Sequence, residues 1–476
     1  MAASPPIVDL PRALVDRYDV PGPRYTSYPS VLHWQTPIDG SSYRDVLRTV
    51  GGDEEPLALY VHLPFCASRC TYCGCNATVT QRPEVVSAYL DRLDRELAMI
   101  EAELGHGRRV QQMHWGGGTP NFLSEPQLVR AFAMLATRFA FAAGAELSIE
   151  ADPRLVTRSQ LRWLRGLGFS RLSYGVQDLD ADVQQAIGRV QPESVVRAAC
   201  DLAREEGFTE LNIDLIYGLP RQTPASFART IGTVLGLQPE RVACFGYAHV
   251  PWQRPHQKRI EERSLPSSHT RLDLFRVAVE RFTSAGYAWL GLDHFARPDD
   301  PLAVAAQERR LHRNFMGYTT MPATHLLGVG VSAIGDLGGH YVQNSARLGA
   351  WQRSIDANEL PVMRAHRLSA DDVARRAAIH HLMCNLELPV DLLPDDAQAL
   401  EATFARFVDD GLMERDAAGW QVTPFGRLFL RNLAMPLDAY LGRDATRGGA
   451  PAEAPEDDAE AVAGLVTVAP RYSRTV

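Results

Sequence analysis

One stretch decides the fold of this chain: Leu57-Ala58-Leu59-Tyr60-Val61-His62-Leu63, followed at once by Pro64-Phe65-Cys66-Ala67-Ser68-Arg69-Cys70-Thr71-Tyr72-Cys73. The first seven residues form a short apolar run, which predicts a buried β-strand. The residues after it carry three cysteines with C-x3-C-x2-C spacing among Ser68, Arg69 and Thr71, so they predict a polar loop. The sequence therefore places a cysteine loop at the carboxyl end of a buried strand.

The same succession of a short apolar run and a longer segment with helical spacing recurs along the rest of the chain. Apolar residues that recur three and four positions apart indicate helices, and short bounded runs indicate strands. The predicted strands cover residues 57–63, 110–115, 146–150, 171–175, 210–217, 241–248 and 287–292. The predicted helices cover residues 84–103, 125–139, 158–167, 192–206, 224–237 and 272–285.

Alternating strands and helices need right-handed crossovers and a parallel sheet, and six or more units favour a closed or nearly closed barrel. The predicted fold class is α/β: a partial or open (β/α) barrel with a smaller, mainly helical C-terminal domain. Chemistry gathers where barrel strands end. Several strands end in polar or glycine-rich turns, at residues 115–120, 150–153, 175–178 and 217–220. These turns outline the mouth of an active site.

Composition narrows the class of protein. The chain has 476 residues, a formal charge of −8 and 45% hydrophobic residues, which suits a large core and excludes a fibre or a disordered chain. Mild acidity without a basic run argues against nucleic-acid binding. No apolar run is long enough to predict a signal peptide or a membrane span. Seven cysteines, four of them within ten residues, are typical of a reducing cytoplasm, where we expect the protein.

We predict four parts: an N-terminal segment packed near the active site (1–50), the barrel domain (51–344), a mainly helical domain (345–442), and an acidic flexible linker with a C-terminal tail (443–476). The third part has a helical stretch at 370–386 and a hairpin at 411–422, an order that resembles a winged helix but lacks an excess of basic residues. Residues 443–460 are mostly Gly, Ala, Pro, Asp and Glu, which cannot offset the entropy of ordering.

The cysteine loop suits an iron-sulfur cluster. Three thiolates can hold three corners of a cubane cluster, and the fourth iron is then open to a small ligand with an amine and a carboxylate. A structural zinc ion is the alternative, with Cys75 as the fourth ligand, although most zinc knuckles come as two separated pairs. Three inert buried cysteines are a third reading, which the polar loop disfavours.

The C-x3-C-x2-C loop followed by Gly74-Cys75-Asn76 resembles the radical S-adenosylmethionine (SAM) enzymes, and specifically the oxygen-independent coproporphyrinogen III oxidase family (coproporphyrinogen dehydrogenases). The resemblance covers nearly the whole chain. It is carried by residues 22–29 (Gly-Pro-Arg-Tyr-Thr-Ser-Tyr-Pro), 60–66, 114–120 (His-Trp-Gly-Gly-Gly-Thr-Pro), 212–220, 247–249, 293–300 and 312–315.

The resemblance implies a barrel of the radical SAM type, one 4Fe-4S cluster and two SAM molecules. It assigns the cluster to Cys66, Cys70 and Cys73, with Cys75 as a nearby catalytic cysteine that is not a ligand. Tyr60 is implied to touch the cluster-bound SAM and to take part in catalysis. The remaining residues implied at the first SAM are Gly118, Glu150 and Ile334, and those implied at the second are Tyr72, Thr119, Gln177, Arg189, Asp214 and Ala248.

The activity implied by the family is anaerobic oxidative decarboxylation in haem biosynthesis. A 5′-deoxyadenosyl radical from SAM takes a hydrogen atom from a propionate β-carbon, and loss of carbon dioxide and one electron leaves a vinyl group. Two such events convert coproporphyrinogen III to protoporphyrinogen IX. An electron donor such as a flavodoxin or a ferredoxin is implied, and we expect a monomer without a nucleic-acid or membrane partner.

Arg24 and Arg313 are our candidates for contacts to substrate propionates, because a guanidinium group meets a carboxylate in a two-pronged geometry. Surface ion pairs are the alternative for both.

A haem chaperone from a sister branch of the superfamily is the alternative function. That branch shares the cysteine loop and the Gly-Gly-Gly-Thr-Pro turn but lacks both the 22–29 segment and a cysteine at position 75, whereas this chain has both. Modification of tRNA, a third reading, would call for a basic surface.

Overall fold

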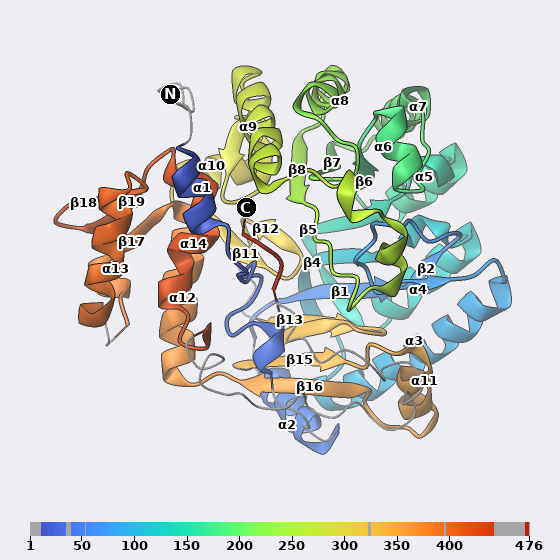
Figure 1. Ribbon diagram of the computed structural model, residues 1–476. Helices are drawn as coiled ribbons and strands as arrows, with labels where there is room; N and C mark the ends of the chain where they lie inside the picture. The colour runs from blue at the N-terminus through green and yellow to red at the C-terminus, as the bar shows by residue number, and fades with distance from the viewer. Residues whose placement is uncertain are drawn as a thin grey trace, which may run out of the picture.

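The computed structural model describes residues 11–34, 40–52, 54–321, 325–394, 397–441 and 472–475. One long, strongly curved sheet runs through it, with helices along its outer side (Figure 1). The predicted acidic linker at 443–460, and the tail as far as residue 471, lie outside the described residues. Within the described part, no helix is both long and apolar enough to cross a membrane.

Six parallel strands form the centre of the sheet, each hydrogen-bonded to the next in chain order. They are β1 (Leu57–Leu63), β4 (Arg108–Gly117), β5 (Phe139–Ala151), β6 (Arg171–Gln177), β7 (Glu210–Tyr217) and β8 (Arg241–Gly246). The helices between and after them are α3 (Pro83–Leu104), α4 (Glu125–Ala136), α5 (Arg158–Gly166), α6 (Ala181–Ala186), α7 (Glu193–Glu205), α8 (Pro224–Gly236) and α9 (Ser268–Ser284). The predicted α/β fold with an open (β/α) barrel is confirmed.

The two faces of the barrel strands differ in polarity. In β6 and β7, buried residues alternate regularly with partly exposed ones. Because successive side chains of a strand point to opposite faces, the apolar residues pack under the helices. The polar residues, among them Ser173, Asn212 and Asp214, face the barrel interior. The sequences of β6 and β7 thereby direct polar side chains into the interior.

Shorter strands extend the sheet beyond both ends of the parallel core. On one side, β13 (His325–Val329) pairs with β1 in parallel, and three antiparallel strands follow: β14 (Ile334–Leu337), β15 (His340–Asn344) and β16 (Val362–Arg367). On the other side, β8 pairs with the antiparallel β10 (His294–Ala296), which pairs with β9 (Ala288–Leu290). The strand predicted at 287–292 is therefore an edge strand and not a seventh barrel unit.

The C-terminal elements pack on the barrel without a break in the core. They are α11 (Leu348–Asp356), α12 (Ala370–Asn385), α13 (Ala397–Asp409), α14 (Leu430–Ala434), and a small sheet of β17 (Glu387–Pro389), β19 (Gly419–Val422) and β18 (Met413–Arg415). Buried side chains of α12 and α13 belong to the same apolar cluster as those of β1. The domain boundary at residue 344 stays a prediction; α11 contacts α3, and β16 joins the barrel sheet.

The N-terminal segment and the last described residues meet at the barrel. After α1 (Arg12–Tyr18), Pro21 pairs with Arg474 in an antiparallel bridge. The guanidinium group of Arg431 donates hydrogen bonds to the carbonyl oxygens of Gly22, Pro23 (3.0 Å) and Arg474 (2.9 Å). The segment then enters the barrel mouth, while α2 (Gly40–Gly51) packs against α3 (Figure 1). One buried arginine thus ties both ends of the described chain together.

A buried carboxyl group links α3 to the extended sheet. Glu96 of α3 is 1% exposed and accepts hydrogen bonds from the backbone N–H of Gly330 (3.0 Å), from Asn344 (2.6 Å) and from Trp351 (3.1 Å). Burial raises its pKa from 4.5 to about 7, against the effect of these hydrogen bonds. The neutral form is therefore favoured by folding.

We predict that Glu96 makes the protein less stable as the pH rises. Its contribution is fully present below about pH 4.5, the ordinary pKa, and is lost as the pH passes about 7. Between pH 6 and pH 8.5, the melting temperature of the wild type should fall relative to that of Glu96→Gln by roughly a few degrees. The exposed Glu84→Gln on the same helix is the control. A constant difference between wild type and Glu96→Gln across this range would contradict the assignment.

Candidate functional site

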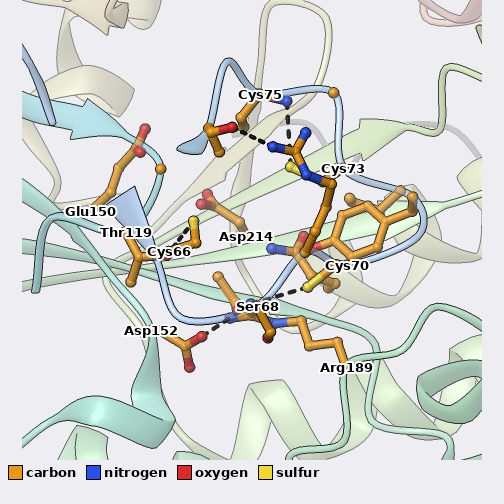
Figure 2. A pocket seen from close by; sticks show the side chains of 18 of the residues that line it. Cys66, Ser68, Cys70, Cys73, Cys75, Thr119, Glu150, Asp152, Arg189 and Asp214 are labelled. Carbon is orange, nitrogen blue, oxygen red and sulfur yellow. Dashed lines mark hydrogen bonds and ion pairs between the residues drawn. The ribbon is translucent and has the colours of Figure 1, made fainter. Parts of the chain in front are cut away.

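A cavity of about 620 Å³ opens at the carboxyl ends of the barrel strands, within the size range of small-molecule sites. Figure 2 shows cysteines, carboxylates and an arginine gathered around this one space. Most of the predicted site residues line it: Arg24, Cys66, Cys70, Tyr72, Cys73, Cys75, Gly118, Thr119, Glu150, Gln177, Arg189, Asp214 and Ala248. Residues spread over more than two hundred positions of sequence are thus brought to one mouth.

Three predicted site residues do not line this cavity. Tyr60 of β1 hydrogen-bonds His62 Nδ1 at 3.0 Å and packs beside Gly116, one layer below the mouth. Ile334 begins β14, beyond β13. Arg313 is buried, donates a hydrogen bond to the backbone oxygen of Arg24 at 3.1 Å and lies over the Tyr318 ring. The structure therefore places Arg313 behind Arg24.

The shape of the cysteine loop is fixed through its backbone. Three successive carbonyl oxygens, those of Tyr72, Cys73 and Gly74, accept hydrogen bonds from the side chains of Gln257 (2.8 Å), His256 (2.7 Å) and Arg254 (2.9 Å). On the other side of the loop, the N–H of Thr71 donates to the carbonyl of Ile187 at 3.0 Å. The loop is held between the short helix after β8 and the end of α6.

Each of the three cysteines has a different neighbour. The Sγ of Cys66 lies 3.2 Å from Thr119 Oγ1, and burial raises the pKa of Cys66 to about 11. Cys70 Sγ accepts a long hydrogen bond from Arg189 Nη1 at 3.9 Å. A hydrogen bond from the Cys75 side chain lowers the pKa of Cys73 to about 6, and the Cys75 N–H donates to the same sulfur at 3.4 Å.

The donor set fits a cluster better than a single ion. Within the described chain, no three His, Cys, Asp or Glu side chains converge as the ligands of one metal ion do. A zinc site formed with Cys75 would need such convergence. In a cubane cluster each cysteine binds a different iron, so the thiols need only line one space. Cys66, Cys70 and Cys73 meet this condition.

The glycine turn after β4 brings two strand ends into contact. A Cβ on Gly118 would lie 2.5 Å from the Pro64 oxygen, so only glycine allows this approach. Gly118 N–H donates to Leu63 O at 2.9 Å, and Thr119 N–H donates to Phe65 O at 2.8 Å. Gly118 is therefore needed for the contact between the cysteine loop and this turn, whether or not a ligand binds there.

Two carboxylates in the mouth have different charge states. Glu150 accepts a hydrogen bond from Gly117 N–H (3.1 Å) and lies 3.5 Å from His114 Nε2; although burial acts in the opposite direction, these partners lower its pKa. Asp214 accepts from Asn212 (2.7 Å) and Ser173 (3.1 Å), but burial, together with the charge of Glu150, raises its pKa to about 6. Glu150 is thus charged at neutral pH, and Asp214 titrates just below it.

The end of β6 is irregular where it faces the cavity. Gln177 has φ of 68°, in the left-handed region, and the pairing with β7 shifts register between Gly175 and Gln177. A Cβ on Gly175 would lie 2.8 Å from the Gln177 amide nitrogen. Arg189 donates to Gly175 O at 2.6 Å and pairs with Asp152 at 3.1 Å. This bulge turns both the Gln177 amide and the Arg189 guanidinium toward the mouth.

Several residues that shape the site could not be predicted from the sequence. Arg254, His256 and Gln257 lie in a stretch without strand or helix periodicity, and their role depends on contacts with a loop about 180 positions earlier. Asp152 lies in the turn at residues 150–153, which the sequence predicts to be part of the mouth. Its pairing with Arg189 follows from tertiary structure alone.

Known proteins of similar sequence and structure agree with this geometry. A family model described as the radical SAM superfamily matches residues 60–234. Two relatives named oxygen-independent coproporphyrinogen III oxidase are 43% identical (Escherichia coli, 92% of this chain and 97% of the relative) and 38% identical (Synechocystis, 93% and 97%). The solved structure of coproporphyrinogen III oxidase from Escherichia coli, described as a radical SAM enzyme, superposes with a TM-score of 0.84 at 43% identity, covering 91% of this chain and 100% of that one.

None of these relatives is named as a haem chaperone. With this identity over nearly its whole length, and with the cysteine loop at the mouth of an open barrel, the chain belongs to the oxygen-independent coproporphyrinogen III oxidase family of radical SAM enzymes.

Proposed function

We propose that this chain converts coproporphyrinogen III to protoporphyrinogen IX without oxygen, by oxidative decarboxylation of two propionate side chains to vinyl groups. The observation that carries the proposal is the joint lining of one cavity by Cys66, Cys70 and Cys73 together with the polar ends of β5, β6 and β7. Relatives that match over nearly the whole chain carry the name of this oxidase.

The cysteine loop is proposed to hold one 4Fe-4S cluster through Cys66, Cys70 and Cys73. When bound, the cluster and SAM together supply the radical that starts the reaction. Hydrogen bonds from the side chains of Gln257, His256 and Arg254 hold the backbone of this loop in place, which supports this assignment. Cys75 is exposed and contacts Cys73, so it stays available beside the cluster.

The SAM contacts are proposed in two groups. Glu150, Gly118, Tyr60 and Ile334 belong to the first SAM, where the charged Glu150 suits an ammonium group. The residues proposed for the second are Tyr72, Thr119, Gln177, Arg189, Asp214 and Ala248. All six of the latter, together with Glu150 and Gly118, line one cavity, which supports their assignment to SAM. Arg189 also pairs with Asp152.

The substrate is proposed to enter between the cysteine loop and the N-terminal segment. Arg24 of that segment lines the cavity and is a candidate for a propionate contact. Arg313 supports it from behind, through the hydrogen bond to the Arg24 carbonyl. The segment also covers the mouth, which limits access of water to a radical intermediate.

Three further features complete the proposal. The electron donor is a small redox protein such as a flavodoxin or a ferredoxin. The cytoplasm is the proposed compartment, because all seven cysteines are free thiols. We also propose that the protein works as a monomer.

Anaerobic turnover tests the function directly. With a chemical reductant and SAM, the reconstituted chain should convert coproporphyrinogen III to a product that is lighter by two molecules of carbon dioxide and four hydrogen atoms, with about two methionines formed per product. Mass spectrometry and methionine analysis measure both. Porphyrin binding without vinyl formation would refute the oxidase and favour a haem-binding role.

The cysteine assignment is tested by a matched pair of variants. Cys66→Ser should lose most of the roughly four irons per chain expected for a cubane cluster and should no longer cleave SAM. Cys75→Ser should retain the iron and the visible absorbance but turn over poorly, because it removes a thiol that contacts Cys73 without being a ligand. Undiminished cleavage in Cys66→Ser, or loss of iron in Cys75→Ser, would contradict the ligand set.

Asp214 should make SAM binding depend on pH. Its carboxyl group has a pKa of about 6, so it is charged at pH 8 and largely neutral at pH 5.5. If the charged form binds SAM, affinity weakens as the pH falls through about 6. Asp214→Asn should bind about tenfold more weakly at pH 8 and lose the pH dependence, as measured by anaerobic equilibrium dialysis. The exposed Asp182→Asn serves as the control, and an unchanged pH profile in Asp214→Asn would exclude this role.

A further inference from the structure

Four arginines from separate parts of the chain meet beside the main cavity. They are Arg24 of the N-terminal segment, Arg271 in the first turn of α9, Arg431 of α14 and Arg474 near the C-terminus. They line a smaller pocket of about 40 Å³. Arg24 and Gly246 line both spaces, so the pocket adjoins the main cavity on the side away from the cysteine loop.

The positive charge in this pocket is not balanced. Asp293 is the one carboxylate among the residues that line it, and it already accepts a hydrogen bond from His294 at 2.8 Å. Arg474 pairs with Asp19 at 2.6 Å, outside the pocket. Within the described ranges, no carboxylate lies within 4.0 Å of the guanidinium nitrogens of Arg24, Arg271 or Arg431. Buried cations are normally paired, so this excess calls for an anion.

Two of the arginines retain hydrogen-bond donors. Arg431 uses its donors on the backbone carbonyls of both chain ends. Arg24 makes a single side-chain hydrogen bond, to Gly246 O at 2.6 Å. The guanidinium group of Arg271 makes none to any described residue, and its Nε is shielded from solvent without a partner. Arg24 and Arg271 are therefore the pair that can bind a ligand.

The turn after β7 sets the position of Arg271. The Arg271 side chain lies over Gly218, where a Cβ would stand 3.4 Å from both its Cγ and its Nε. Gly218 has φ of 85°, which favours glycine. Beside it, the Tyr217 ring stacks on Phe275 with centroids 5.1 Å apart. Because Gly218 has no side chain, the Arg271 side chain can lie directly against this turn, and its guanidinium group is held at the pocket.

Repulsion between the arginines of this pocket also favours the binding of an anion. Burial lowers the pKa of Arg24 and lowers that of Arg431 to about 9, and in both cases neighbouring arginines act in the same direction. A carboxylate that entered between these groups would relieve both effects. The volume suits a carboxylate on a short arm and is far too small for a pyrrole ring.

We propose that Arg24 and Arg271 together bind one carboxylate of the tetrapyrrole, on a propionate arm that is not decarboxylated. The inference rests on the proposed function. A propionate held in this pocket keeps its β-carbon away from the cysteine loop, so no hydrogen atom is taken from it and its carboxylate is retained. Anchoring a retained arm here turns the opposite side of the macrocycle toward the cysteine loop. Arg271 is then a residue that selects which propionates react.

Equilibrium binding of coproporphyrin III, the stable oxidised form of the substrate, tests this without turnover. Fluorescence titrations compare the wild type with Arg271→Gln, Arg271→Lys and the control Arg281→Gln, an exposed arginine on the same helix. Loss of a hydrogen-bonded charge should raise the Kd of Arg271→Gln at least tenfold. Arg271→Lys should be intermediate, because lysine keeps the charge but not the two-pronged geometry. Arg281→Gln should match the wild type.

The tetramethyl ester of coproporphyrin III separates recognition of a carboxylate from a structural role. Wild type and Arg271→Gln should bind the ester with equal affinity, and their melting temperatures should agree. A Kd of Arg271→Gln within twofold of the wild type for the free acid overturns the inference, as does an equal loss of affinity for acid and ester. If the wild type forms no vinyl groups, the proposed function fails; if it does and Arg271→Gln binds the acid normally, only this inference fails.

Discussion

Parallel pairing from β1 to β8 is the constraint on which the rest of the structure depends. Because six strands run in the same direction, their carboxyl ends meet at one edge of the curved sheet. This pairing brings the cysteine loop after β1 to the same edge of the sheet as Glu150 in β5 and Asp214 in β7. The polar residues that alternate along β6 and β7 then determine which groups face inward.

Local surroundings give similar side chains in this mouth different properties. Glu150 and Asp214 are both buried carboxylates, yet their pKa values move in opposite directions because Glu150 has His114 and the Gly117 N–H as partners, while Asp214 has neutral partners and a negative neighbour. Arg189 and Arg271 differ in the same way. Arg189 is neutralised by Asp152, whereas Arg271 has no carboxylate within 4.0 Å among the residues that the structure describes.

Much of the fold could be predicted from the sequence, because β1 and β7 are apolar runs with clear ends, and the structure gives them the predicted bounds. The strands β13 to β16 could not be predicted, because each has only four to six residues, too few to show a periodicity. Most site residues could be predicted from motifs at strand ends. The position of Arg313 behind Arg24, and the pocket around Arg271, depend on contacts between distant segments that no local pattern encodes.

The bridge between Pro21 and Arg474 has a consequence for biosynthesis. During translation, Arg24 leaves the ribosome long before Arg474 and Thr475 are synthesised. The N-terminal segment of the nascent chain therefore cannot yet make its contacts with these residues at this side of the mouth. The hydrogen bonds of Arg431 to both segments can form only once the residues around Arg474 have been synthesised. Closure of this side of the mouth by the N-terminal segment is therefore a late step of folding, although the segment precedes the whole barrel in the sequence.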